Sequence, residues 1–179
     1  MPAHIDCGIC IVRSYAATDR EALAAQANNR KIWMNVRDYF PHPYTLEAAE
    51  QWIGHASSAD PESHFAVEAD GQFAGGIGLK LQSDVDRVSA ELGYWLGESF
   101  WGRGIATAAI TGFVPWAFEQ FQLERIFAVP FHWNAASSRA LEKAGFNKEG
   151  VMRRAAIKDG VLADLPLYAR YRVEPVRTG

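Results

Sequence analysis

A short glycine-bearing segment in the middle of the chain carries the clearest chemical signal in the sequence. Gly102 and Gly104 stand between a β-rich run that ends at Gly97 and a helical pattern that begins at Gly104. Glycines let the backbone approach a ligand closely, and the free N–H groups and positive dipole end of a helix attract anions. The segment therefore predicts a cradle for a phosphate group. A tight strand-to-helix turn without a ligand is the alternative.

Two familiar phosphate-binding motifs do not fit the spacing of this segment. A P-loop requires Gly-x-x-x-x-Gly-Lys-Ser/Thr, which the chain lacks. A dinucleotide fingerprint places its glycines directly after the first strand, whereas this segment lies in mid-chain and has Thr107 at the third position. A nucleotide-binding oxidoreductase is therefore a disfavoured alternative.

Glu91 supplies a carboxylate on the run that leads into the cradle. The alternation over residues 87–97 predicts a strand with Glu91, Gly93 and Trp95 on one face. An attacking amine is mostly ammonium at neutral pH, and a carboxylate beside it can accept the proton that it must lose. The alternative role for Glu91 is an ion pair with Arg87 or another cation.

The chain shows the two-residue repeat that is typical of strands and the repeat of about 3.6 residues that is typical of helices. Residues 28–44 form an irregular aromatic connection, and Pro115 predicts a bend or a late start of the third helix. The order predicts an α/β (α+β) fold with a mixed central sheet of about seven strands and helices on both faces. The patterns indicate strands near 9–11 and over 65–69, 72–81, 87–97 and 125–130, a closing hairpin around 159–160, and helices over 18–27 (a capping box of Thr18 and Glu21), 45–55, from 104, and 134–144.

The composition limits the class of protein. A chain of 179 residues, 49% of them apolar, suits one core, so we expect a single domain over residues 1–173 and a short C-terminal tail over 174–179. The formal charge of -3 gives no electrostatic reason to bind nucleic acid. No run approaches the roughly 20 apolar residues of a membrane span, and no secretory signal opens the chain. The expected location is cytoplasmic, with no membrane partner.

Cys7 and Cys10 are the two cysteines of the chain, and two residues separate them. This spacing occurs in redox pairs and in half of a zinc site, but the five histidines do not supply the other half at matching spacing. We therefore expect no metal. A redox pair and two small buried residues on a first strand remain the alternatives.

Two separated segments resemble the acetyl-CoA-binding signature of the GNAT superfamily of N-acetyltransferases. The resemblance is strongest to its Rim-type branch, which acetylates N-terminal amines of ribosomal proteins. It implies the GNAT fold, acetyl-CoA as co-substrate, and acetyl transfer to the primary amine of a protein N-terminus or a small molecule. A non-catalytic acyl-CoA sensor is the alternative from another class. The two segments are residues 100–109 (FWGRGIATAA) and 134–146 (NAASSRALEKAGF).

The resemblance also implies roles for individual residues. Asn134 would bind the pantetheine arm of the cofactor and Ser137 would protonate the departing thiolate, although Asn134 suits an N-cap equally well and a helix serine often bonds to its own turn. Trp95 and Leu96 would lie along the cofactor, with backbone N–H groups near Leu96 polarising the acetyl carbonyl. The pyrophosphate loop falls on Trp101, where the general superfamily pattern has Gln or Arg, and on Gly102, Arg103, Gly104, Ile105 and Ala106.

For the amine acceptor, residues 28–44 fall where the family forms one wall of the cleft. Trp33, Tyr39 and Tyr94 are the expected contacts, with Glu91 as the base. Cover of the core and a homodimer contact are the alternatives for the aromatic residues. The chain has no Gly-x-Ser-x-Gly elbow, so we expect direct attack by the amine rather than an acyl-enzyme.

Overall fold

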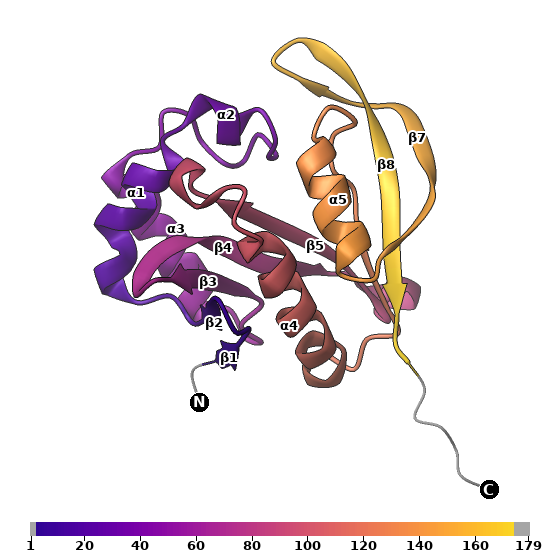
Figure 1. The fold of residues 1–179 in the computed structure, drawn as a ribbon, viewed down its shortest axis with the longest axis horizontal. Coiled ribbons are helices and arrows are strands. Elements are labelled where there is room, and N and C mark those ends of the chain that lie inside the picture. The colour runs from indigo at the N-terminus through magenta and orange to yellow at the C-terminus, as the bar shows by residue number, and fades with distance from the viewer. Residues whose placement is uncertain (1–2, 174–179) are drawn as a thin grey trace, which may run out of the picture.

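The computed structural model describes residues 3–173, which form one eight-stranded sheet (Figure 1). The tail predicted over 174–179 lies outside the described residues. The strand order is β1-β2-β3-β4-β5-β6-β8-β7, in which only β5 and β6 are parallel neighbours. The strands are β1 (His4–Asp6), β2 (Ile11–Arg13), β3 (His64–Ala69), β4 (Gln72–Leu81), β5 (Ser89–Leu96), β6 (Arg125–Ala128), β7 (Asn147–Lys158) and β8 (Val161–Tyr171).

Helices cover both faces of this sheet. Phe65 and Val67 on β3 belong to the apolar cluster around α4, whereas Ala66 between them belongs to the cluster around α1 and α3. Because side chains alternate across a strand, α1 and α3 lie on one face and α4 on the other, with α5 beside α4. The helices are α1 (Arg20–Ala27), α2 (Arg30–Trp33), α3 (Leu46–Ser58), α4 (Ile105–Gln120) and α5 (Ala135–Lys143).

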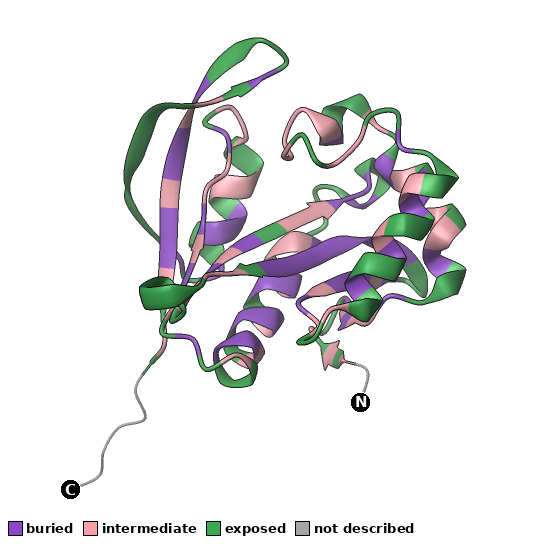
Figure 2. Cartoon of the chain, turned by 180° about the vertical axis from the view of Figure 1, so that it is seen from behind, coloured by how far each residue is buried: buried purple, intermediate pink, exposed green. Residues whose placement is uncertain are grey.

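The predicted mixed sheet with helices on both faces is confirmed, with eight strands in place of seven. The additional strand is β1, which pairs with β2 through His4–Asp6 and which its short polar sequence did not reveal. At the other edge of the sheet β7 is exposed over nearly its whole length, while buried positions follow the central strands (Figure 2). Within residues 3–173, no helix combines the length and apolarity needed to cross a bilayer.

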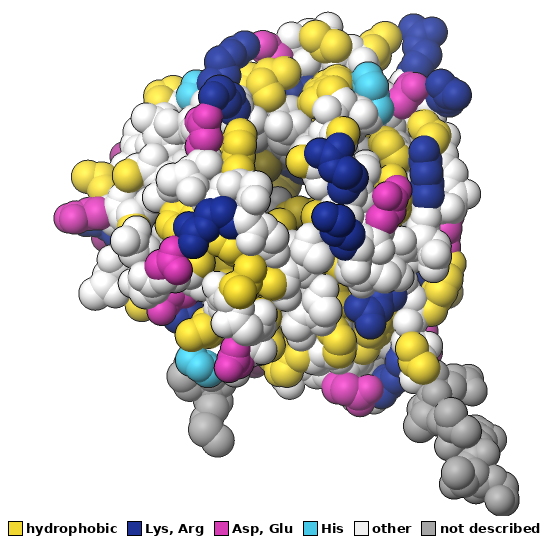
Figure 3. All heavy atoms as spheres, in the orientation of Figure 1, with side chains coloured by type: hydrophobic (Ala, Val, Ile, Leu, Met, Phe, Trp, Pro, Cys, Tyr) yellow, Lys and Arg dark blue, Asp and Glu magenta, His cyan; other side chains and the backbone are white. Residues whose placement is uncertain are grey.

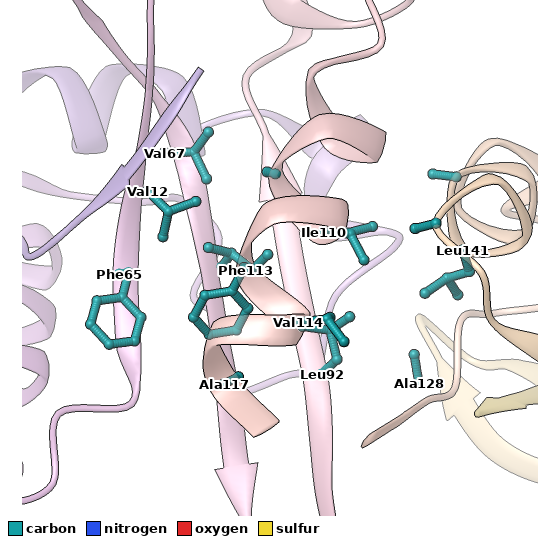
Figure 4. Packing of buried hydrophobic residues seen from close by; sticks show 14 of the residues in the cluster. Val12, Phe65, Val67, Leu92, Ile110, Phe113, Val114, Ala117, Ala128 and Leu141 are labelled. Carbon is teal, nitrogen blue, oxygen red and sulfur yellow. The ribbon is translucent and has the colours of Figure 1, made fainter. Parts of the chain in front are cut away.

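The larger core is built around α4 (Figure 4). Ile110, Phe113 and Val114 have no exposed surface and lie between side chains of the sheet and of α5. The helix begins at Ile105 and runs past Pro115, so a late start is wrong. Apolar residues on both sides of the proline are buried, which offsets the one backbone hydrogen bond that it removes.

The start of α1 differs from the predicted capping box. Residues Ala17–Asp19 form a 3-10 turn, and Thr18 does not cap the helix. Asp19 is buried, accepts a hydrogen bond from the backbone N–H of Ala16 at 2.8 Å and pairs with Arg13 at 2.8 Å. An ion pair to β2 therefore fixes this turn, and the local sequence pattern does not reveal such a pairing.

The start of α3 agrees with the sequence, and its end does not. Thr45 caps the helix by accepting a hydrogen bond from the N–H of Ala48 at 3.1 Å. The helix then continues to Ser58 rather than ending near His55, because Ala56 is buried against the sheet.

Both predicted Asp-Gly hairpins form. Asp70 and Gly71 have φ angles of 54° and 70°, and Asp159 and Gly160 have φ angles of 49° and 76°. Positive φ at both central residues is the requirement of a type I′ turn, whose twist matches that of paired strands. The second hairpin brings the tip of β7 and β8 toward residues 28–44.

Candidate active site

β5 and β6 are paired only near their starting ends. The last pair in their register joins Glu91 to Phe127, after which β5 continues to Leu96 while β6 ends at Ala128. Where parallel strands part, the backbone groups on the facing edges lose their ladder partners. We call this opening, along residues 92–96 of β5, the splay. The same face of the molecule is hollowed over the region between α4 and α5 (Figure 3).

Alternate backbone groups of β5 point into the splay. The N–H of Gly97 donates to a carbonyl of β4 at 2.8 Å, and the carbonyl of Val88 accepts the N–H of Arg125, at the start of β6, at 3.2 Å. Because these directions alternate along a strand, the N–H groups of Tyr94 and Leu96 point toward the β6 side. Among residues 3–173 no acceptor pairs with either group. Both N–H groups are therefore available to a ligand.

The glycine turn leads from the splay into α4. Gly102 and Gly104 have φ angles of 71° and 77°, in the left-handed region that favours glycine. Gly104 is the N-cap of α4 and has no side-chain oxygen, so no side chain caps the first N–H groups of this helix. A Cβ at Gly102 would meet no atom within 4 Å. The turn is thus open and lined by N–H groups, which fits the predicted anion cradle.

The side chains of the glycine turn are engaged elsewhere. The indole Nε1 of Trp101 donates to the carbonyl of Leu96 at 2.8 Å. The guanidinium of Arg103 pairs with Asp70 at 2.5 Å and lies 5.7 Å from the ring centre of Phe100. The turn therefore offers a ligand its backbone at Gly102, Gly104, Ile105 and Ala106 more than its side chains.

Tyr94 and Ser137 meet on the α4 and α5 side of the sheet, so Tyr94, expected from the sequence to contact the acceptor with Glu91, lies on the opposite face of β5 from that carboxylate. Their hydroxyl oxygens lie 2.5 Å apart, and burial raises the pKa of Tyr94 to about 12. Asn134 holds the start of α5 in place by accepting a hydrogen bond from the N–H of Ser137 at 3.2 Å, so its capping role is confirmed. At neutral pH the two hydroxyl groups are neutral and can relay a proton.

Glu91 points to the opposite face of β5. Its Oε1 lies 3.6 Å from Nη2 of Arg37, and 27% of its side chain is exposed. Arg87, the cation named from the sequence, instead donates to the carbonyl of Asp84 at 2.8 Å. Arg37 also donates to the carbonyl of Val129 at 3.3 Å. The long contact with Arg37 leaves the carboxylate of Glu91 accessible to a substrate.

Aromatic side chains line the face that carries Glu91. The ring of Trp95 packs edge-on against Phe40 at 5.4 Å and tilts against Phe73 at 6.0 Å. Trp95 therefore stands on the Glu91 side of the sheet rather than on the Tyr94 side. Although most of the Tyr39 ring is exposed, its pKa is raised, first by lost hydration and second by the charge of Glu91. Tyr39 is thus an electrostatic neighbour of the carboxylate.

The 28–44 segment, which contains α2 and connects α1 to α3, is tied to the tip of the β7–β8 hairpin. Lys158 is the central residue of this connection, since only 1% of its side chain is exposed. Its ammonium lies 3.8 Å from the ring centre of Trp33, which anchors the segment. We call these contacts the clasp, and they join Lys158 to Asp38 at 2.7 Å, Arg30 to Asp159 at 2.5 Å, and Lys158 to Trp33.

Sequence reasoning missed Arg37, Asp38 and Lys158, which shape the Glu91 side. Lys158 and Asp38 are 120 positions apart in the chain, so no local pattern links them. The one available signal was a lysine beside the predicted Asp159-Gly160 turn. Among residues 3–173 no cluster of three or more His, Cys, Asp or Glu side chains could hold a metal ion.

Comparisons with known proteins agree with this geometry. A family model described as acetyltransferase (GNAT) domain matches residues 10–147. The probable N-acetyltransferase YjcK of Bacillus subtilis is 33% identical, over 86% of this chain and 88% of its own. The ribosomal-protein-serine acetyltransferase of Escherichia coli is 32% identical over 59% of each chain.

A solved structure extends the likeness over nearly the whole fold. RimL, a ribosomal L7/L12 alpha-N-protein acetyltransferase in complex with coenzyme A, superimposes with a TM-score of 0.84 at 19% identity, covering 94% of this chain and 98% of its own. The family match covers the splay, the glycine turn and the start of α5 together. This chain therefore belongs to the GNAT family of acetyltransferases.

Proposed function

We propose that this chain transfers the acetyl group of acetyl-CoA to the α-amine of a protein N-terminus, with the two faces of β5 dividing the work. As a GNAT member the chain is an acetyl-CoA-dependent N-acetyltransferase. The observation that carries the finer proposal is the unpaired edge of β5 over residues 92–96, at a strand with Glu91 on one face and the Tyr94–Ser137 pair on the other. Residues 1–173 act as one catalytic domain.

The donor is held mainly by backbone groups. The amides of the glycine turn, from Gly102 to Ala106, hold the diphosphate of the coenzyme. The N–H groups of Tyr94 and Leu96 donate to the acetyl carbonyl, and such fixed donors stabilise the negative charge that develops on this oxygen during attack. Asn134 uses its oxygen for the helix cap, which leaves its amide nitrogen free for the pantetheine arm.

Proton transfer takes place on both faces of β5. Glu91 accepts a proton from the ammonium group of the acceptor, directly or through water, so that the nitrogen lone pair can attack. As the new C–N bond forms and the C–S bond breaks, the nitrogen releases its second proton to water and the sulfur leaves as a thiolate. Ser137 and Tyr94 supply the proton of the thiolate and take one back from water. Positioning the two reactants contributes the rest of the rate enhancement.

A protein N-terminus is the acceptor best supported. The Escherichia coli relative is a ribosomal-protein-serine acetyltransferase, and RimL is an alpha-N-protein acetyltransferase. An α-amine has a pKa near 8, whereas that of a lysine lies above 10, so it loses its proton to a carboxylate more readily. The side chain of Glu91 keeps 27% of its surface exposed, beside the exposed ring of Tyr39, so the amine at a chain end can reach the carboxylate.

The test is release of free thiol from acetyl-CoA with a panel of peptides, polyamines and aminoglycosides. We expect turnover with peptides that have a free N-terminus, an added acetyl group at that N-terminus by mass spectrometry, and no turnover with the same peptides blocked at the N-terminus. Equal turnover with blocked, lysine-containing peptides would reject the N-terminal acceptor. Binding of acetyl-CoA without thiol release from any amine would indicate the acyl-CoA sensor instead.

Replacing Tyr94 by phenylalanine should lower kcat about tenfold, with KM for acetyl-CoA unchanged. The effect is moderate because a thiol with a pKa near 8.5 leaves readily as a thiolate. Ser137→Ala should cost a similar factor, and the double variant little more than either single one, since the two hydroxyls act as one relay. Tyr171→Phe is the matched control, because this tyrosine is 52% exposed and far from the splay in the sheet. Additive losses would argue against a shared relay.

Gly104→Ala should weaken acetyl-CoA binding about tenfold in calorimetry. Space for a methyl group exists, since the nearest atom to an added Cβ is Cδ1 of Ile9 at 4.0 Å. The positive φ is what opposes alanine, at about 1–2 kcal/mol, and the helix start must shift to relieve it. Gly54→Ala in α3 is the matched control, because its Cβ meets nothing within 4 Å and its φ is helical. Unchanged affinity in Gly104→Ala would contradict the cradle.

A further inference from the structure

The two cysteines face each other across the turn that joins β1 to β2. The register that pairs Asp6 with Ile11 continues to Cys7 opposite Cys10, and the N–H of Cys7 donates to the carbonyl of Cys10 at 2.9 Å. Gly8 has a φ of 81°, which suits the first central position of a two-residue hairpin turn. The acetyl-transfer mechanism uses neither thiol.

The hairpin geometry brings the two thiols within reach of a disulfide bond. Directly opposed residues at a hydrogen-bonded position have Cα atoms about 5.5 Å apart, and disulfides span roughly 4.4–6.8 Å. Opposed residues also project their side chains from the same face of the ribbon. The close approach of the two thiols lowers the pKa of Cys7 and raises the pKa of Cys10, which burial raises further. Cys7 is thus the more reactive thiol.

The same turn packs against the start of α4 and its cradle. The Sγ of Cys10 donates to the carbonyl of Ile105 at 3.8 Å, and Cδ1 of Ile9 lies 4.0 Å from the Cβ position of Gly104. The Sγ of Cys7 fills the place left by the missing side chain of Gly112, 2.4 Å from its Cβ position.

A groove of about 500 Å³ gives small molecules a route to the half-buried Cys7. It is lined by Cys7, Gly104, Thr107, Ala108, Thr111, Gly112 and Lys143.

We propose that Cys7 and Cys10 are a reversible dithiol–disulfide pair whose oxidation lowers the affinity of the cradle for the coenzyme. The oxidant is a low-molecular-weight disulfide. The thiolate of Cys7 attacks one of its sulfurs, so that a mixed disulfide forms and one small thiolate leaves. Cys10 then loses its proton and attacks the sulfur of Cys7, which releases the second small thiolate. The protein loses two protons and two electrons, and the small disulfide is reduced to two thiols.

The effect on the coenzyme follows from the contacts of the turn. An S–S bond draws the sulfur of Cys10 away from the carbonyl of Ile105 and the sulfur of Cys7 away from Gly112. The first turn of α4, which supplies the N–H groups of the cradle, then loses the packing that positions it. Linkage requires that a bound coenzyme in turn favours the dithiol form. This coupling rests on the proposed cradle, whereas the disulfide itself does not.

The disulfide is tested on the full chain by thiol trapping. The reduced protein is equilibrated with mixtures of oxidised and reduced glutathione, quenched with acid, alkylated and analysed by mass spectrometry. We expect a species that lacks two hydrogen atoms and resists alkylation at both cysteines. In Cys10→Ser the reaction should stop at a glutathione adduct on Cys7. Cys7→Ser should form no adduct, because its remaining thiol, Cys10, is buried. A glutathione adduct that persists in the wild type, or thiols that stay reduced throughout, would overturn the proposal.

The coupling is tested by calorimetry with desulfo-coenzyme A, which has no thiol to interfere. We expect about tenfold weaker binding to the oxidised than to the reduced protein, and no effect of glutathione on binding by Cys7→Ser. Equal affinity of both forms would reject the coupling and keep the disulfide. Absence of binding to either form, with the disulfide formed, would reject the cradle itself and with it the proposed mode of donor binding.

Discussion

Replacing Glu91 by glutamine should lower kcat/KM for the acceptor by about 10²–10⁴-fold, the range that a general base contributes. The variant keeps the shape of the side chain and removes its ability to take a proton from the ammonium group. Affinity for acetyl-CoA should stay unchanged, because Glu91 and the Tyr94 pair lie on opposite faces of β5. Steady-state rates of thiol release and calorimetry measure the two quantities separately.

The loss in Glu91→Gln should shrink as the pH rises through the pKa of the acceptor, near 8 for an α-amine. Above that pH most of the amine is already deprotonated, so a general base contributes less to the rate. Glu68→Gln is a matched control, because Glu68 is also 27% exposed and paired with an arginine, Arg13 at 2.7 Å. If kcat/KM of Glu91→Gln at pH 7 stays within a factor of three of the wild-type value, Glu91 is not the base, and its role is limited to the ion pair with Arg37.

Replacing Phe113 by alanine should lower the free energy of unfolding by about 3–5 kcal/mol, the cost of removing a fully buried phenylalanine. The ring has no exposed surface and lies beside Phe65 in the core (Figure 4). The ring centres of Phe65 and Trp116 are each 5.6 Å from that of Phe113. Because domains of this kind are stable by only about 5–15 kcal/mol, the loss is a large fraction of the total. Urea unfolding followed by circular dichroism measures it.

Two further variants separate packing from surface effects. Phe113→Leu keeps most of the volume and should lose clearly less stability than the alanine variant. Val85→Ala, at a side chain that is 75% exposed, should stay within about 0.5 kcal/mol of the wild type. A Phe113→Ala loss below about 1.5 kcal/mol would mean that the core around α4 collapses to fill the cavity, contrary to the rigid support that the cradle needs.

Much of the fold followed from local patterns. The Asp-Gly turns, the start of the helix near residue 45 and the helix that follows Asn134 depend on residues close in sequence, and the structure has each of them. The start of α1 did not follow, because Asp19 pairs with Arg13 on another element.

The candidate site divides in the same way. The glycine turn and Asn134 were evident from spacing, since a turn and a helix cap are local features. The hydrogen bond between Tyr94 and Ser137 joins residues 43 positions apart, and the clasp at Lys158 joins more distant ones. Such contacts arise only when the sheet brings its strands together, so no periodicity in the sequence encodes them.

The parting of β5 from β6 has a consequence for how this enzyme can change its specificity. In the proposed mechanism the pleat of β5 places the base Glu91 and the acid pair Tyr94–Ser137 on opposite faces of the strand, so that amine and thioester approach it from opposite sides. Substitutions in residues 28–44 or at the hairpin tip can alter which amine is admitted while the thioester side stays intact. Acceptor choice can therefore evolve through residues 28–44 and the hairpin tip, while the other side of β5 remains adapted to a single activated donor.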